Sequence, residues 1–163
     1  MRKEASHPDR TRRLIIKGAA AGAVFGLGLG ARVNRAQAAD AAKWPKDAFA
    51  QKTEADAIKT LYGKDAEVSD KVRLDAPEIA ENGAVVPISI SSTLPDVTSI
   101  AILVSENPFP LAAAYAIPAG TTGTVANRLK MAKTSKVVAL VEAGGKIYSA
   151  SKEVKVTVGG CGG

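Results

Sequence analysis

From residue 64 to residue 158, apolar side chains largely alternate with polar ones in short runs, and turn-forming residues separate the runs. Such alternation is typical of strands that bury one face. The clearest runs are Val86, Ile88, Ile90 and then Ile100, Ile102, Val104. We count six to eight such runs, with no helical pattern between them. A segment of about 95 residues organised in this way predicts a mainly β, immunoglobulin-like antiparallel β-sandwich.

One short helix is predicted ahead of the strands. Pro45 and Asp47 are favourable at a helix start, and Gly63 is a typical stop signal. Between them, apolar residues recur at roughly helical spacing: Phe49, Ala57, Ile58 and Leu61. We therefore expect a single helix that begins near Pro45 and ends at Gly63.

Several turns are also readable. Glu81-Asn82-Gly83 predicts a turn, and Pro87 suggests that its strand lies at a sheet edge or contains a bulge. Residues 137–142 and 146–150 are expected to form a hairpin closed by Ala143-Gly144-Gly145. A further, final strand is expected to carry Val154, Val156 and Val158.

Residues 1–38 have the pattern of an export signal. Arg12 and Arg13 lie in the segment Thr11-Arg12-Arg13-Leu14-Ile15-Ile16-Lys17, which matches the twin-arginine pattern, and Ala36-Gln37-Ala38 offers a small-x-small cleavage site. The apolar stretch between them is too short and too rich in glycine to anchor the chain in a membrane. We interpret residues 1–38 as a twin-arginine signal peptide that exports a folded protein to the bacterial periplasm.

The positive charge of the chain lies in that leader. The whole sequence has a formal net charge of +6, and residues 1–38, with eight Lys/Arg and two Asp/Glu, account for all of it. Residues 39–163 hold 14 Lys/Arg and 14 Asp/Glu. A neutral mature domain has no basic surface to attract a phosphate backbone, so we expect no nucleic-acid partner.

The composition excludes much enzyme chemistry. The one histidine, His7, lies in the predicted leader, and the one cysteine is Cys161. A mature chain without histidine cannot build a Ser-His-Asp triad, a Cys-His dyad or a histidine-ligated metal site, and one thiol cannot form an internal disulfide. We expect no metal, no cofactor and no catalytic residue in this chain.

Cys161 lies at the end of the sequence between Gly159, Gly160, Gly162 and Gly163, directly after a predicted strand. Glycine hinders its neighbours least and is costly to order, so we expect residues 159–163 to form a flexible arm. Three residues beyond Val158 reach at most about 10 Å. Nothing nearby in the sequence lowers the thiol pKa from its ordinary value of about 8.5.

Three interpretations of this arm compete: a frayed tail, a tail that forms intermolecular disulfides, and a covalent carrier arm that other enzymes load and unload. An exposed thiol oxidises readily, which disfavours a tail without a use. A thiol on a thin tether, with no neighbouring residue that activates it, favours the interpretation as a covalent carrier arm. The predicted organisation is thus a signal peptide (residues 1–38), a carrier domain (39–158) and a carrier arm (159–163).

The arm also carries a resemblance to a known family. The ending Val158-Gly159-Gly160-Cys161-Gly162-Gly163 is similar to that of SoxY, the sulfur-carrier family of the thiosulfate-oxidising Sox system. The stretches Met131–Ser135, Gly145–Val156 and Asn107-Pro108-Phe109-Pro110-Leu111-Ala112 also resemble the family, and the twin-arginine leader fits. The similarity is strongest from about Arg128 onward.

The resemblance implies a function as well as an immunoglobulin-like fold. Cys161 would be the carrier thiol, and a SoxZ-like β-sandwich subunit would complete a heterodimer. A haem-containing enzyme would conjugate thiosulfate to the thiol, a metal-dependent hydrolase would release sulfate to leave a persulfide, and a sulfane dehydrogenase would oxidise the outer sulfur. The alternative function is a non-catalytic periplasmic sandwich cross-linked through Cys161.

Overall fold

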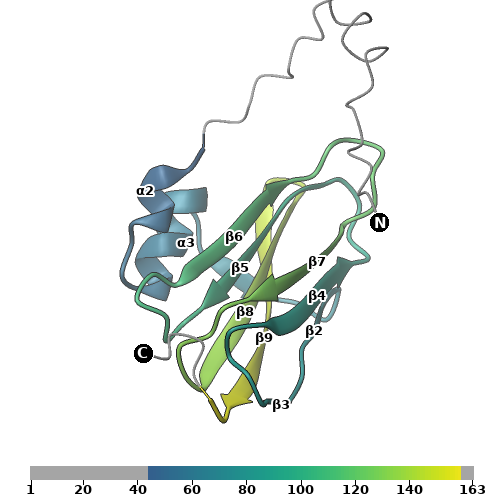
Figure 1. Ribbon diagram of the computed structural model, residues 1–163. Coiled ribbons are helices and arrows are strands. Elements are labelled where there is room, and N and C mark those ends of the chain that lie inside the picture. The colour runs from purple at the N-terminus through teal and green to yellow at the C-terminus, as the bar shows by residue number, and fades with distance from the viewer. Residues whose placement is uncertain (1–43, 159–163) are drawn as a thin grey trace, which may run out of the picture. The chain divides into compact units, whose positions relative to one another are not determined.

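The computed structural model of the chain describes residues 44–158, which form two helices and nine strands (Figure 1). The predicted leader with Arg12 and Arg13 and the predicted arm around Cys161 lie outside the described residues. One sheet has the strand order β1 (Ala66–Val68), β9 (Lys146–Val156), β8 (Ser135–Ala143), β5 (Val97–Val104), β6 (Leu111–Ala116), with β3 (Ile79–Ala80) also paired to β9. The second sheet consists of β2 (Val72–Asp75), β4 (Val86–Ser92) and β7 (Thr124–Leu129).

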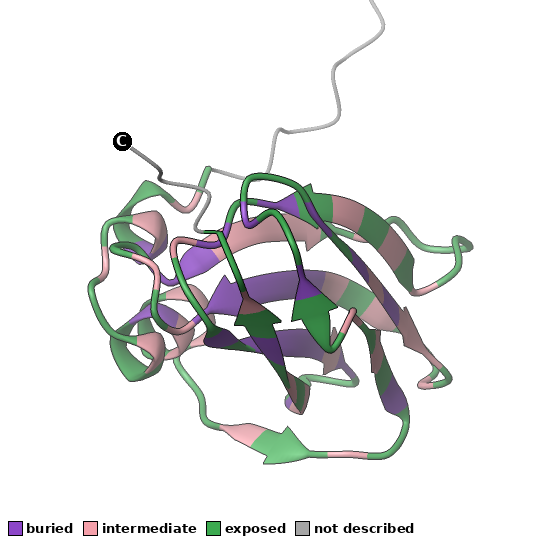
Figure 2. Cartoon of the chain, turned by 60° about the horizontal axis from the view of Figure 1, so that its bottom comes forward, coloured by how far each residue is buried: buried purple, intermediate pink, exposed green. Residues whose placement is uncertain are grey.

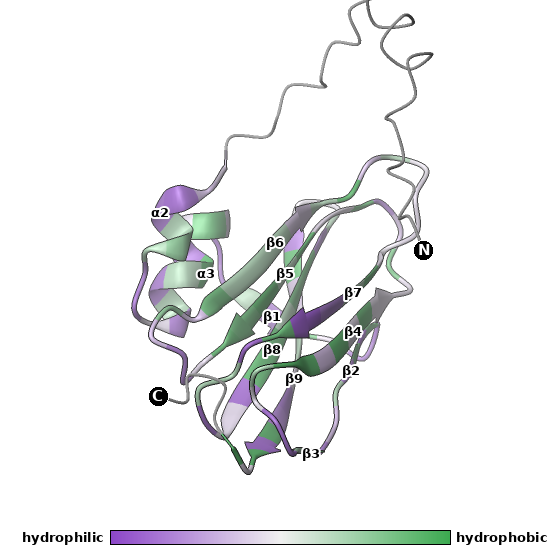
Figure 3. Ribbon diagram, in the orientation of Figure 1, coloured by the Kyte–Doolittle hydropathy of each residue, from purple (hydrophilic) through white to green (hydrophobic). Residues whose placement is uncertain are grey.

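The two sheets pack face to face around one apolar core. The predicted alternation in β4 is confirmed, because Val86, Ile88 and Ile90 are all buried against the other sheet. In β5 the residues Ile100, Ile102 and Val104 enter the same core. Figure 2 shows buried segments in purple along the strands, and Figure 3 shows the apolar character of β5 against the polar β7. The predicted mainly β, immunoglobulin-like sandwich is therefore confirmed.

Both faces of the six-stranded sheet are covered. The second face of β5 and β8 packs against the helical segment, where it forms a separate apolar cluster: Ala48, Ala57, Ala101, Leu103, Leu111, Val138, Leu140 and Ile147. Glu54 fixes the helical segment to the sheet, since its carboxylate accepts a hydrogen bond from Ser105 Oγ (2.6 Å) and pairs with Lys136 Nζ (3.1 Å). Because of this second cluster, β5 is buried on both faces from Ile100 to Val104, and the alternation of buried and exposed residues expected for this run is not found.

The single predicted helix is wrong: the segment forms two helices, α2 (Lys46–Phe49) and α3 (Glu54–Tyr62). The break arises at Thr53, which has an extended backbone and caps α3 by accepting a hydrogen bond from the Asp56 N–H (3.1 Å). The predicted stop is confirmed, because Gly63 ends α3 with a positive φ of 67°. Neither helix among residues 44–158 is long and apolar enough to cross a membrane.

The predicted hairpin at residues 143–146 is confirmed, with Ala143 paired to Lys146. Gly144 and Gly145 have φ values of 56° and 73°, which a two-residue hairpin turn of this hand requires. The separate final strand is wrong, because Lys146–Val156 is one continuous strand that ends before Val158. No break separates Ala150 from Val154, because the ladder with β8 continues through Ser151, Lys152 and Glu153.

Two pairings depart from a purely antiparallel sandwich. The short strands β1 and β3 both run parallel to β9 and lie at successive positions along one of its edges, at residues 147–149 and 155–156 of β9. Pro87 does not mark an edge strand, because β4 is the middle strand of its sheet. Pro87 instead lies beyond the last residue of β4 that β2 reaches, so the missing N–H costs no bond to β2.

Candidate functional site

The predicted site residues themselves lie outside the described part of the chain: Cys161, Gly159, Gly160, Gly162, Gly163, Arg12 and Arg13. The structure does define how the chain is held just before Gly159. We call residues 156–158 the arm base. Their position is set by the end of β9 and by loops from three distant parts of the sequence.

The segment 78–83 runs beside the arm base and holds its backbone. In β3, Ile79 and Ala80 pair in parallel with Lys155 and Val156. Four hydrogen bonds continue this contact: Lys155 N to Glu78 O (2.9 Å), Thr157 N to Ala80 O (3.1 Å), Thr157 Oγ1 to Glu81 O (3.0 Å) and Gly83 N to Val158 O (2.8 Å). The backbone is therefore fixed up to Val158, the last described residue.

A second set of contacts involves the loop between β7 and β8, which the loop after β5 holds in turn. The Val156 N–H donates to Thr134 Oγ1 (2.9 Å), and the Met131 N–H donates to the carbonyl of Gly83 (2.7 Å). Asn107 then holds the segment around Met131: its Nδ2 donates to Lys130 O (2.8 Å) and its Oδ1 accepts from Ala132 N (3.0 Å). Hydrogen bonds thus run from Asn107 through Met131 and Gly83 to Val158.

The sequence indicated only part of this arrangement. The turn at Glu81-Asn82-Gly83 was predicted, and the Asn82 side chain closes it by accepting from the Ala84 N–H (2.8 Å). The stretch that begins at Asn107 was singled out by resemblance, and the structure gives its physical role in the contacts above. Thr134 lies in a stretch that resembles the family, but its bond to Val156 could not be predicted, and Thr157 carried no sequence signal, because an exposed threonine reads the same whether or not its hydroxyl is bonded.

Replacing Asn107 with alanine is expected to lower the free energy of unfolding by about 1–2 kcal/mol, since it removes two hydrogen bonds. Asn107→Asp keeps the acceptor for Ala132 and loses the donor to Lys130, so it should have about half that effect. Urea unfolding measures the free energies, and amide exchange at Gly83 and Ala132 measures the local opening. Equal stability of the alanine variant and the parent would show that this loop does not brace the arm base.

Apolar side chains are exposed around the arm base. Val158, Ile79 and Val85 keep 63%, 59% and 53% of their surface accessible. They lie on the arm base, on its parallel neighbour β3 and just after the turn that bonds Val158. Exposed apolar residues on three mutually bonded segments are suited to contact another protein surface.

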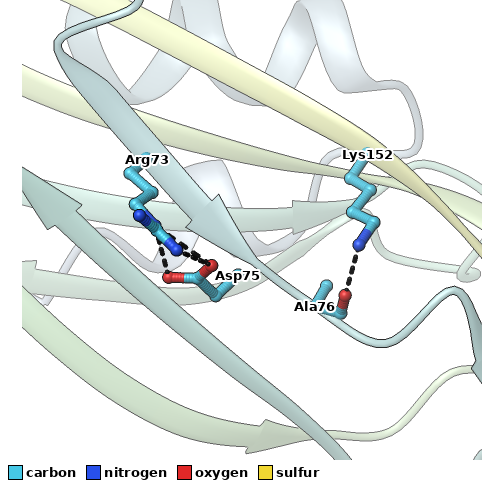
Figure 4. A network of polar contacts seen from close by, with 4 residues as sticks. All are labelled: Arg73, Asp75, Ala76 and Lys152. Atoms are coloured by element: carbon cyan, nitrogen blue, oxygen red, sulfur yellow. Dashed lines mark hydrogen bonds and ion pairs between the residues drawn. The ribbon is translucent and has the colours of Figure 1, made fainter.

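A groove of about 700 Å³ lies beside the end of β2, and its lining includes Asp75, Pro77, Pro87, Ser89 and Arg128. Figure 4 shows the polar contacts at its border: Arg73 Nε lies 3.0 Å from Asp75 Oδ2, and Lys152 Nζ donates to Ala76 O (2.6 Å). The hydrogen bond with Arg73 holds the pKa of Asp75 below its ordinary value. Because both groups are exposed, the pair contributes little to stability.

Four ion pairs join charged side chains among the described residues. Lys133 Nζ lies 2.8 Å from Glu106 Oε2, and the hydrogen bond with Lys133 lowers the pKa of Glu106. Within residues 44–158, no three acidic, histidine or cysteine side chains are grouped so that they could hold a metal ion. At this end of the sandwich, the described residues hold the backbone of the arm base in position.

Comparisons with known proteins identify a family. Residues 58–161, a range that reaches Cys161, match the family described as sulfur oxidation protein SoxY. The structure of the sulfur carrier protein SoxY from Chlorobium limicola f thiosulfatophilum is 40% identical, with a TM-score of 0.59, and the match covers 64% of this chain and 96% of that one. No curated protein sequence is significantly similar to the chain.

Two further structural matches are more remote. The endo-β-1,4-mannanase from Thermotoga petrophila is 12% identical with a TM-score of 0.40, over 64% of this chain and 23% of that one. A structure of the superantigen toxic shock syndrome toxin-1 is 12% identical with a TM-score of 0.36, over 52% and 98%. Similarity at that level carries no argument about function.

Proposed function

Because the chain belongs to the SoxY family of sulfur oxidation proteins, we propose that it is a sulfur carrier of the Sox system and holds sulfur intermediates covalently on Cys161. The observation that carries the proposal is the extent of the family match, which runs from α3 to the one cysteine of the sequence. The rigidly bonded arm base supports it, since a carrier thiol needs a fixed point from which a thin segment extends.

The proposed chemistry takes place on sulfur atoms that are attached in turn to the Cys161 thiol. Loading forms a disulfide bond between the Cys161 thiol and the outer sulfur of thiosulfate, giving a cysteine S-thiosulfonate. One proton and two electrons leave in this step, and a haem-containing partner accepts the electrons. A metal-dependent hydrolase then catalyses the attack of water on the sulfonate sulfur. Sulfate is released, and a persulfide remains on Cys161.

Two further steps are proposed to remove the outer sulfur of the persulfide from Cys161. A sulfane dehydrogenase oxidises the outer sulfur to a sulfonate: three water molecules supply the oxygen atoms, six protons are released, and six electrons pass to a redox protein that serves this enzyme as electron acceptor. A second hydrolysis then releases sulfate and regenerates the thiol. In this scheme the chain supplies no catalytic residue, and the partner enzymes supply every acid, base and metal. A glycine on each side of the thiol suits entry into several different active sites, because no side chain beside it would collide with their walls.

The location and the pairing of the protein are part of the proposal. The Arg12-Arg13 leader supports export in the folded state to the periplasm. A SoxZ-like β-sandwich subunit is the proposed heterodimer partner. The exposed Ile79, Val85 and Val158 around the arm base offer apolar surface that a protein contacting the loaded arm would cover.

Intact-mass spectrometry tests the carrier role against a tail that only forms disulfides. After incubation with thiosulfate and the partner enzymes, we expect a mass increase equal to S₂O₃ or to one sulfur atom, which a thiol reductant reverses. Disulfide-linked dimers form under both interpretations, so they do not distinguish them. Protein that stays unmodified while thiosulfate is consumed would refute the carrier role.

A further inference from the structure

A pocket of about 420 Å³ opens on the outer face of the six-stranded sheet, beside the C-terminal end of α3. It is separate from the arm base and from the proposed carrier chemistry. Its lining combines aromatic and apolar walls with two polar groups: Trp44, Leu61, Tyr62, Ser99, Ala114 and Glu142. The helical segment contributes one wall, and β5, β6 and β8 contribute the other.

The polar part of the pocket is centred on the half-buried carboxylate of Glu142. Its Oε2 accepts hydrogen bonds from Thr98 Oγ1 (3.1 Å) and Ser99 Oγ (3.3 Å). Ser99 Oγ also lies 3.0 Å from the Tyr62 hydroxyl. Burial raises the pKa of Tyr62 to about 12, so its hydroxyl stays protonated and neutral at physiological pH.

The Glu142 carboxylate has no cationic partner among residues 44–158. The ion pairs of this part of the chain join other residues: Arg73 to Asp75, Lys133 to Glu106, Lys136 to Glu54 and Lys146 to Glu67. Among the described residues, only two neutral hydroxyls contact this carboxylate, so they do not compensate its negative charge in a partly enclosed site. A cation that enters the pocket would therefore be attracted, whereas an anion would be repelled.

The aromatic wall favours a flat cation. Trp44 stacks on Phe49 with ring centroids 4.5 Å apart and an angle of 11° between the planes, yet 67% of its surface remains exposed. The indole ring attracts cations most strongly among aromatic side chains. A guanidinium group can lie against such a ring and donate paired hydrogen bonds to a carboxylate in the same pose.

We propose that this pocket binds an arginine side chain of a partner protein. The guanidinium pairs with Glu142, its face lies against Trp44, and its methylene groups contact Leu61 and Ala114. The Glu142 carboxylate attracts a positively charged group, which favours an arginine over an aliphatic side chain. The exposed indole ring can stack against a planar group, which favours an arginine over a lysine. The pocket therefore marks a contact surface that is independent of Cys161.

The one tryptophan of the sequence makes the test direct, since Trp44 gives one indole N–H signal in a nitrogen-15 spectrum of the full chain. The probe is N-acetyl-arginine methylamide, and its neutral isostere N-acetyl-citrulline methylamide is the ligand control. We expect a saturable shift with half-saturation on the order of millimolar for the arginine probe, and at least roughly tenfold weaker binding of the citrulline probe.

Glu142→Gln should weaken binding of the arginine probe about tenfold, and the exposed control Glu153→Gln should leave it unchanged. Trp44→Leu, followed at the Ser99 amide, should also weaken binding, which keeps the test valid if one variant is unstable. Equal affinity for the two probes, no saturable shift, or stronger binding of a lysine methylamide would overturn the proposal.

Discussion

Replacing Cys161 with serine is expected to abolish thiosulfate-dependent oxidation in a system reconstituted from the partner enzymes. The hydroxyl of serine cannot form the sulfur–sulfur bond on which every proposed intermediate depends, and the sequence holds no second cysteine. The loss should be complete rather than graded. Oxygen uptake or cytochrome reduction on addition of thiosulfate measures it, and circular dichroism checks that the variant remains folded.

A relocated thiol provides the matched control. The double variant Cys161→Ser, Ser151→Cys places the sulfur on an exposed position of β9, where the strand is paired to β8 at Val138. A thiol fixed on a sheet cannot extend into an active site, so activity should stay lost. Oxidation by the single serine variant above the background without carrier, or recovery in the double variant, would contradict the role of the tethered thiol.

The largest expected effect on stability comes from Ile102→Ala. Ile102 is fully buried between the two sheets and lies on β5, which pairs with both β6 and β8. The truncation should lower the free energy of unfolding by about 2–5 kcal/mol, and Ile102→Val by about 0.5–1.5 kcal/mol. The larger loss is a substantial part of the roughly 5–15 kcal/mol that holds a domain of this kind together.

Urea unfolding followed by circular dichroism measures both variants of Ile102. The folded fraction of the alanine variant should still take up sulfur on Cys161, because the sandwich holds the arm but supplies no reacting group. A small, equal effect of the two substitutions would mean that the space around Ile102 collapses or that the two sheets are not packed through it. Loss of sulfur uptake by well-folded protein would contradict the separation of scaffold and carrier.

The sandwich could be predicted because its strands obey local rules. Val86, Ile88 and Ile90 alternate with exposed or half-exposed neighbours, and adjacent glycines with positive φ close the hairpin after Ala143. In each of these two signals, the residues concerned lie within a few positions of one another in the sequence. The end of α3 at Gly63 was predictable for the same reason.

The sequence-based predictions of helices and strands were wrong where long-range contacts or a single side chain determined the local structure. The cap at Thr53 divided a helix whose apolar spacing gave no sign of a break. The pairing of β1 and β3 with β9 joins residues more than seventy positions apart, and strands of two or three residues have no readable alternation. The extra length of β9 depends on its ladder with β8, which holds Ser151-Lys152-Glu153 in the strand despite their polarity.

The two candidate sites also differ in whether local sequence signals or long-range contacts define them. Cys161 is identifiable from sequence because its neighbours in the chain are what make it unusual. The pocket around Glu142 is not, since Trp44, Tyr62, Ser99 and Glu142 come from separate elements and meet only through the sheet order. The braced arm base belongs to this second kind, as Asn107, Gly83 and Val158 are joined only by the fold.

The most direct test of the carrier role is the mass of one peptide. Trypsin cleaves after Lys155 and releases the peptide that begins at Val156 and contains Cys161. After conjugation with thiosulfate this peptide should gain S₂O₃, and after the hydrolase it should retain one sulfur atom that a thiol reductant removes. An unmodified peptide in samples that oxidise thiosulfate, or the added sulfur on any other peptide, would contradict the assignment of Cys161 as the carrier.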